Sequence, residues 1–144
     1  MEKDFYQISL KLILKNSRDE ILVLKALDTG TYAGFYDLPG GRINKDEFNL
    51  PFEKILRREI KEEIGKVSFK LTSIQPAALG RHKIEGRGNE IHILYLFFEG
   101  RYIKGNIKIS EEHSSYDWLD LEKINLKKYF KSGILEGVEM HLWN

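Results

Sequence analysis

The chain has 144 residues, a formal net charge of +1 and no cysteine. This length suits one domain with a hydrophobic core, and we expect a single domain over residues 1–144. The near-neutral charge argues against a nucleic-acid-binding or membrane-surface protein, and the lack of cysteine excludes disulfides and thiolate metal sites. Because no apolar segment is typical of a signal peptide or membrane span, we expect a cytoplasmic protein.

The N-terminal part predicts a β-hairpin followed by a glycine-containing loop. Apolar and polar residues alternate over residues 6–15, which is typical of a half-buried strand. Residues 20–27 predict a second strand, joined to the first by a short polar turn. Residues 28–36 are expected to form a loop, and Pro39-Gly40-Gly41 is expected to form a tight turn.

The rest of the chain predicts two helices separated by strands. The first helix is expected at residues 51–64, with proline in its first turn and Gly65 as its C-terminal cap. After it, residues 67–79 predict a strand broken by Pro76, residues 80–88 a basic loop, and residues 90–99 an apolar strand. Residues 101–109 predict a short strand, residues 116–124 a strand with a helical turn, and residues from 125 onward a second helix. This order predicts an α+β protein with a mixed sheet between helices.

The first expected helix carries three acidic residues on one side. Glu59, Glu62 and Glu63 are spaced i, i+3 and i+4, which brings their carboxylates together. Glu59 and Glu63 point within about 20° of the apolar position Phe52. Carboxylates in that direction are costly unless they are paired or bind a metal ion, so the pattern predicts a site for a hard divalent cation. The alternative is that the end of the helix projects beyond the core and the acids are solvated.

These glutamates belong to a longer motif. The run Arg58-Glu59-Ile60-Lys61-Glu62-Glu63-Ile64-Gly65 follows Gly41 and Glu47, and Leu38-Pro39-Gly40 precedes them. This pattern resembles the signature of the Nudix hydrolases. The resemblance implies a Nudix-type α/β/α sandwich and an enzyme that cleaves a diphosphate linkage in a nucleoside diphosphate derivative with Mg²⁺ or Mn²⁺.

Two positions depart from the family signature. Three residues are inserted between Glu47 and Arg58, around Phe48-Asn49-Leu50, and Lys66 stands where an apolar residue is usual. The insertion falls in the loop before the helix, where added length is tolerated, so it leaves the spacing of the helix acids intact. It leaves open whether Glu47 keeps its place in the site.

The resemblance also assigns roles to residues of the motif. Glu59, Glu62 and Glu63 are carried over as catalytic carboxylates and metal ligands, with the carbonyl of Gly40 as a backbone ligand. Arg58 is expected to orient one of these glutamates, and its own partner is either Glu62 or an acid across the loop such as Glu47. One glutamate, in the motif or outside it, acts as general base on the attacking water.

An acidic pair outside the motif provides a further candidate. Glu111 and Glu112 lie in a loop just before the strand around Trp118. One of them, with Glu112 favoured, is a candidate for an additional metal ligand or for the general base. The alternative is ordinary solvated charge on a loop.

Two groups of residues are candidates for substrate binding. Tyr32, Phe35 and Tyr36 in the glycine-containing loop are expected either to stack on a base or sugar or to close the end of the sheet. In the basic loop, Arg81 is the candidate phosphate clamp, and the alternative is a solvated hairpin tip. Asp37 is expected to cap a turn, and the alternative is that it accepts a hydrogen bond from a base edge.

The sequence favours a pyrophosphohydrolase for a (deoxy)nucleoside triphosphate or a dinucleoside polyphosphate, because no extra N-terminal domain typical of larger ADP-sugar hydrolases is evident. A nucleotide sugar such as ADP-ribose is an alternative substrate, and a non-catalytic nucleotide sensor is an alternative function. The neutral charge argues against RNA binding or decapping. The expected partner is a nucleotide-type small molecule, without nucleic acid or membrane, and the expected state is a monomer or homodimer.

Overall fold

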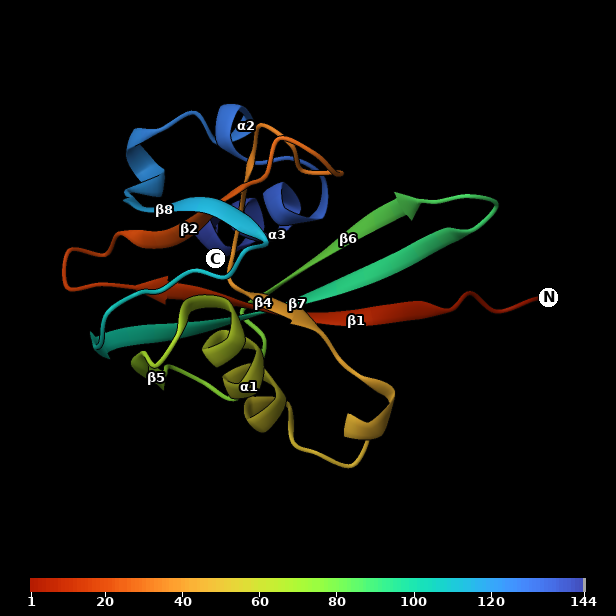
Figure 1. Ribbon diagram of the computed structural model, residues 1–144, viewed down its shortest axis with the longest axis horizontal. Coiled ribbons are helices and arrows are strands. Elements are labelled where there is room, and N and C mark those ends of the chain that lie inside the picture. Colours follow the sequence, from red (N-terminus) through yellow and green to blue (C-terminus); the bar gives the residue numbers. More distant parts are fainter. Residues whose placement is uncertain (144) are drawn as a thin grey trace.

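The computed structural model describes residues 1–143, in which a mixed β-sheet separates two helical layers (Figure 1). Helix α1 (Phe52–Ile64) covers one face, and α2 (Leu126–Tyr129) and α3 (Ser132–Trp143) lie on the other. The strands of this part of the chain are β1 (Tyr6–Lys15), β2 (Ile21–Ala26), β3 (Tyr36–Asp37), β4 (Gly40–Arg42), β5 (Ser68–Leu71), β6 (Ala78–Glu85), β7 (Glu90–Lys104) and β8 (His113–Leu119). This architecture confirms the expected α+β sandwich. None of the described helices is long and apolar enough to cross a membrane.

The centre of the sheet is a parallel pair formed by β1 and β7. Their register runs from Tyr6 opposite His92 to Lys15 opposite Arg101. The long strand β7 pairs antiparallel with β6 along its first part and with β5 along its last part. On the other side of β1, the sheet continues through β2 to β3, while β8 also pairs with β2 and β4 pairs with β1. Each strand thus has a defined neighbour on the sheet.

Alternation along β1 assigns its side chains to two separate cores. Leu10, Leu12 and Leu14 face α1, together with the apolar residues of that helix. Ile13 belongs to the opposite core, which packs under α3. Lys11 occupies the same alternate set as Ile13 and is only 6% exposed, so an ionisable side chain stands where the pattern otherwise places a core residue.

Helix α1 agrees with its sequence signals. Pro51 is its N-cap, where a missing backbone N–H costs nothing, and Gly65 is its C-cap with a φ of 86°. The backbone N–H of Gly65 donates to the carbonyl of Lys61. Ile55, Leu56 and Ile60 are buried against the sheet. The helix prediction is therefore confirmed to within one residue at its start.

Two predicted segments between the helices are wrong. Residues 80–88 were expected to form a loop, yet β6 continues through them to Glu85. Ala78, Gly80 and His82 are buried, while the intervening side chains are exposed, which is the period-two pattern of a strand with one face on the core. The short strand expected at residues 101–109 is instead the end of β7, which stops at Lys104 before Gly105, a residue with a φ of 115°.

Helix α3 lies unusually close to the sheet because glycines meet at the contact. A Cβ on Gly80 would lie 2.2 Å from the carbonyl oxygen of Gly133, and one on Gly133 would lie 2.5 Å from the carbonyl oxygen of Arg81. A Cβ on Gly137 would lie 2.1 Å from the ring of Phe97. The glycines therefore set the distance of α3 from β6 and β7.

Candidate active site

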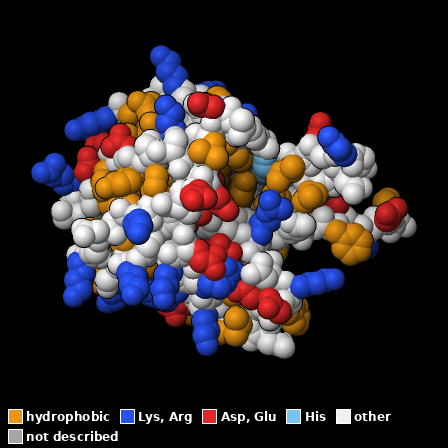
Figure 2. Space-filling model, in the orientation of Figure 1, with side chains coloured by type: hydrophobic (Ala, Val, Ile, Leu, Met, Phe, Trp, Pro, Cys, Tyr) orange, Lys and Arg blue, Asp and Glu red, His pale blue; other side chains and the backbone are white. Residues whose placement is uncertain are grey.

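A polar cavity of about 530 Å³ opens beside the acidic end of α1. Residues from α1, from the sheet and from its loops line it: Ser9, Lys11, Ala26, Leu27, Thr29, Thr31, Tyr32, Asp37, Gly40, Gly41, Arg42, Asn44, Glu59, Glu62, Glu63, His82, Ile84, Ile93, Tyr95, Ser110, Glu112 and His113. Figure 2 shows acidic side chains gathered near the middle of one face, beside a hollow with hydrophobic side chains. The cavity volume is in the range that holds a nucleotide-sized ligand.

Gly40 and Gly41 belong to strand β4 and not to a tight turn, as was expected for Pro39-Gly40-Gly41, because they pair with β1; they place backbone atoms next to the acids of α1. Gly40 has a φ of 142°, and a Cβ there would lie 1.9 Å from the carbonyl oxygen of Leu10. A Cβ on Gly41 would lie 2.1 Å from Oε2 of Glu59. Gly40 requires glycine, because its backbone conformation and its contact with the backbone of β1 leave no room for a side chain, whereas a side chain on Gly41 would displace the Glu59 carboxylate.

Arg58 joins three glutamates from two segments of the chain. Its Nε donates to Oε2 of Glu47 at 2.5 Å, and its Nη2 donates to Oε1 of the same carboxylate at 2.6 Å. It also donates to Glu59 at 2.8 Å and to Glu62 at 3.1 Å. Hydrogen bonds from Arg58 hold the pKa of the buried Glu47 carboxyl below its usual range. Both expected partners, Glu47 and Glu62, are therefore present.

The inserted residues leave the Glu47 contact in place. Glu47 ends a 3-10 turn, Lys45–Glu47, and its Oε1 accepts a hydrogen bond from the backbone N–H of Asn44 at 2.8 Å. Phe48, the first inserted residue, is 90% exposed. The extra length thus bulges into solvent, while Glu47 stays against the helix.

The three helix acids differ in their surroundings. Glu63 is 6% exposed, and burial raises its pKa to about 7. Burial also raises the pKa of Glu59, against the opposing effect of Arg58. The side chain of Glu62 is 63% exposed. The site therefore combines a buried carboxylate that is poised near neutrality with a solvated one.

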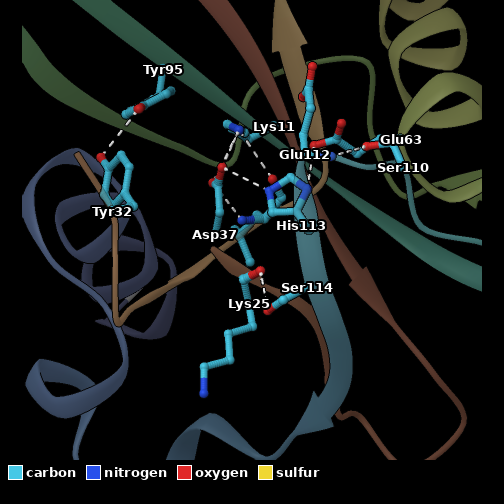
Figure 3. Close-up of polar contacts among 11 residues, drawn as sticks. Lys11, Lys25, Tyr32, Asp37, Glu63, Tyr95, Ser110, Glu112, His113 and Ser114 are labelled. Atoms are coloured by element: carbon cyan, nitrogen blue, oxygen red, sulfur yellow. Dashed lines mark hydrogen bonds and ion pairs between the residues drawn. The ribbon is translucent and has the colours of Figure 1, made fainter. Parts of the chain in front are cut away.

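Behind Glu63, three ionisable side chains form a polar row through the sheet (Figure 3). Nδ1 of His113 lies 3.6 Å from Glu63, and its Nε2 lies 3.8 Å from Asp37. Lys11 Nζ lies 3.1 Å from Asp37 and also donates to the carbonyl of Leu38. Burial raises the pKa of Asp37, but the charges of Lys11 and His113 outweigh it and hold this pKa below its usual range.

The far end of the cavity is aromatic. The hydroxyls of Tyr32 and Tyr95 are hydrogen-bonded at 3.2 Å, and the rings of Tyr32 and His82 have centroids 4.8 Å apart. The Lys11 ammonium lies 5.7 Å from the centre of the Tyr95 ring, so the polar row ends against this cluster. Figure 3 shows the two tyrosines on one side of the row and Glu63 on the other.

The structure brings most of the predicted site residues to one cavity. Gly40, Tyr32, Glu112 and the three helix acids line it, and Arg58 lies behind the acids. Glu112 comes from the loop before β8, which is held to α1 by a hydrogen bond from Ser110 N–H to the carbonyl of Glu63. The expected neighbourhood of the helix acids, the glycine pair and the acidic loop is therefore observed.

Three predicted substrate-binding residues lie elsewhere. Arg81 is on the outward-facing side of β6 and does not line this cavity, because strand alternation points its side chain away from the buried His82. Tyr36 packs on Tyr129 with ring centroids 5.6 Å apart, and Phe35 lies under the ammonium of Lys131 at 5.1 Å. These placements give no support to a phosphate clamp at Arg81 or to substrate stacking by the latter pair.

Sequence reasoning did not assign Lys11, Tyr95 or His113 to the site, and it placed His82 only in a basic loop with Arg81. Lys11, His82, Tyr95 and His113 come from four different strands, so no local spacing connects them. Lys11 left no signal, because the alternation over residues 6–15 places it in the polar set of the strand. His82 had a signal in the alternation of β6, which the basic character of the segment obscured.

The carboxylates suit a hard cation, although their side chains are not yet arranged around one. Within residues 1–143, no three acidic or histidine side chains converge as a ready metal-binding cluster. Arg58 draws Glu59 and Glu62 towards itself. The available donors are nevertheless all oxygen atoms, and the missing side chain at Gly41 leaves this glycine directly against Glu59. This chemistry fits a hard divalent metal ion.

Comparisons with known proteins give the family. A model of the NUDIX domain matches residues 6–136. The nucleoside triphosphatase NudI of Escherichia coli O139:H28 (strain E24377A / ETEC) is 32% identical over 117 residues, which cover 78% of this chain and 80% of that protein. The chain therefore belongs to the Nudix family of hydrolases, as its motif predicted.

Solved structures agree with this assignment. The MutT protein from Methanosarcina mazei Go1 is 28% identical, with a TM-score of 0.64 over 85% of this chain and 83% of that one. An ADP-ribose pyrophosphatase from Streptococcus suis 89-1591 has a TM-score of 0.66 at 16% identity, covering 96% and 91% of the two chains. The second likeness supports the fold alone.

Proposed function

We propose that this protein is a divalent-metal-dependent pyrophosphohydrolase whose substrate is a nucleoside or deoxynucleoside triphosphate, with Mg²⁺ or Mn²⁺ as the metal. One observation carries the proposal: Glu59, Glu62 and Glu63 line one end of a nucleotide-sized cavity together with Gly40 and Gly41, and the Glu59 carboxylate lies directly against Gly41. The relative NudI is named as a nucleoside triphosphatase, which favours a triphosphate over the other substrates.

The glutamates of α1 and the carbonyl of Gly40 are the groups that would hold the metal. A bound divalent ion supplies Lewis-acid chemistry, since it neutralises phosphate charge and makes a water molecule more nucleophilic. Arg58 is a positioning residue, because it contacts Glu47, Glu59 and Glu62 and does not line the cavity. Its four hydrogen bonds hold these carboxylates in position before the substrate binds.

Two carboxylates are candidates for the general base. The pKa of Glu63, raised to about 7 by burial in the metal-free protein, suits proton transfer near neutral pH. Glu112 lines the same cavity from the loop before β8 and faces Glu63 as a second negative charge. Either group has the chemistry to accept a proton from the attacking water.

Other substrates, and a role without catalysis, are compatible with the same fold. A dinucleoside polyphosphate or a nucleotide sugar such as ADP-ribose carries the same diphosphate linkage, and a solved structure of similar fold is an ADP-ribose pyrophosphatase. A non-catalytic sensor is disfavoured because all three helix acids are present and none is lost to a substitution. We further propose one domain, a monomer or homodimer, no nucleic-acid partner and a cytoplasmic location.

The test is a phosphate-release screen with Mg²⁺ or Mn²⁺. The panel contains nucleoside triphosphates, deoxynucleoside triphosphates, dinucleoside polyphosphates and nucleotide sugars, with Glu63→Gln as the control. Adding pyrophosphatase or phosphatase separately identifies the bond that breaks. Metal-dependent turnover of a triphosphate that Glu63→Gln lowers by orders of magnitude is expected. Equal activity of wild type and variant, or no turnover of any compound, would contradict the proposal.

A further inference from the structure

His82 presents an unusual combination of burial and an unused polar atom. It is 8% exposed, and its Nδ1 is hydrogen-bonded to Oγ of Ser132 at 2.7 Å. Its Nε2 is buried and has no hydrogen-bond partner among the described residues. Leaving such an atom unpaired is unfavourable, so a ligand that pairs with it gains affinity.

The surroundings of His82 suit a flat, uncharged ring. Tyr32 and Tyr95 are its aromatic neighbours, with ring centroids 4.8 Å and 6.3 Å from that of His82. Ile84 and Ile93 complete this end of the cavity. Aromatic and branched apolar side chains favour stacking and apolar contact, while the single polar atom Nε2 of His82 can orient the bound ring through a hydrogen bond.

Charge separates this aromatic end from the acidic end. Burial lowers the pKa of His82, and the nearby ammonium of Lys131 lowers it further, so the imidazole is neutral at pH 7. The charged groups of the cavity are gathered instead around Lys11, Asp37 and the helix acids. A ligand that spans the cavity would thus place its neutral ring at His82, away from the ionised groups.

We propose that the aromatic end holds the nucleobase and that Nε2 of His82 makes a hydrogen bond to the base edge, which makes His82 a specificity residue. The inference rests on the proposed function, because it takes the phosphates to lie at the acidic end. Tyr32 lies in the loop between β2 and β3 and lines the cavity at this end, so the base would lie beside its ring.

The test measures binding without metal and without turnover. Nucleoside 5′-monophosphates of the common bases and ribose 5-phosphate are titrated in EDTA into wild-type protein, His82→Phe and the matched control His92→Phe. His92 pairs with Asp4 and Glu90 outside the cavity. Because ribose 5-phosphate lacks only the base, the ratio of the two dissociation constants isolates the contribution of the base.

Wild-type protein is expected to bind at least one nucleoside monophosphate more tightly than ribose 5-phosphate. His82→Phe is expected to reduce that ratio by about tenfold, the size of one hydrogen bond, while leaving ribose 5-phosphate binding unchanged. His92→Phe should keep the wild-type ratio. His82→Gln, which restores a polar group, should recover part of it and serves as the second variant if the phenylalanine variant does not fold.

Three results would overturn the proposal: a wild-type ratio near one, an unchanged ratio in a folded His82 variant, or an equal loss for both ligands. The last result would mean that His82 only supports the structure. Because the assay needs neither metal nor hydrolysis, its failure is distinguishable from failure of the proposed function. Base-dependent binding without turnover would leave the inference standing and remove the enzymatic assignment.

Discussion

Glu63 illustrates how a single carboxylate can be placed at a cost to stability. Its side chain is buried against His113, and burial raises its pKa to about 7 in the metal-free protein. A carboxyl group with a raised folded-state pKa stabilises the fold when protonated. That contribution is present below its unfolded pKa and is lost as the pH rises through about 7.

The metal-free protein should therefore become less stable between pH 5 and pH 8 in a way that depends on Glu63. Urea unfolding in EDTA is expected to show that Glu63→Gln gains about 1–3 kcal/mol relative to wild type over this interval. Comparing the two proteins at each pH cancels the other titrating groups. A constant difference at all pH values would show that Glu63 is not buried as a neutral group.

Residues of the motif were predictable because their arrangement is local. A helix with acids at i, i+3 and i+4 fixes their common side whatever the rest of the fold does, and Arg58 reaches Glu62 through the same periodicity. Lys11 and His113 could not be placed in this way. They meet Asp37 only because β1, β3 and β8 come together in the folded sheet.

Among the elements, the contact between α3 and the sheet depends on glycine. Gly137→Ala places a methyl group 2.1 Å from the Phe97 ring, and the helix must move away to accommodate it. We expect a loss of about 1–3 kcal/mol in the free energy of unfolding, measured by urea denaturation. Gly86→Ala is the matched control, since its Cβ would meet only the Asn89 carbonyl oxygen at 3.6 Å. Equal stability of the two variants would contradict the close packing.

The insertion before α1 makes a second prediction at this scale. Deleting Phe48, Asn49 and Leu50 removes exposed residues, so the fold and the Glu47–Arg58 pair are expected to persist. Turnover should stay within a few-fold of wild type in the assay described above. A folded deletion variant that has lost activity would show instead that the loop positions the acids.

Strand β6 shows why elements are harder to predict than motifs. Its sequence contains glycine and several basic residues, which are typical of a loop. Pairing with β7 and cover from α3 nevertheless make it a strand, because both supply contacts that a local reading of residues 78–85 cannot include. The prediction that Arg81 contacts substrate depended on the same loop conformation, which β6 does not have.

The whole molecule should report metal binding through its stability. A ligand that binds only the folded state raises the free energy of unfolding, by about 2.7 kcal/mol at one hundred times its dissociation constant. We therefore expect Mg²⁺ or Mn²⁺ to raise the melting temperature of wild-type protein, with a smaller increase for Glu59→Gln. A metal-dependent increase of the same size in both proteins would place the ion elsewhere.

Strand β7 has a consequence for how such an enzyme can diverge. Its first part pairs with β6, which carries the aromatic end of the cavity, and its last part pairs with β5, far along the strand. The acids belong to α1, outside the hairpin altogether. Mutations that reshape the hairpin can therefore accumulate without touching the hydrolytic groups. Over generations, a lineage can exchange one preferred nucleotide for another while its reaction chemistry is inherited unchanged.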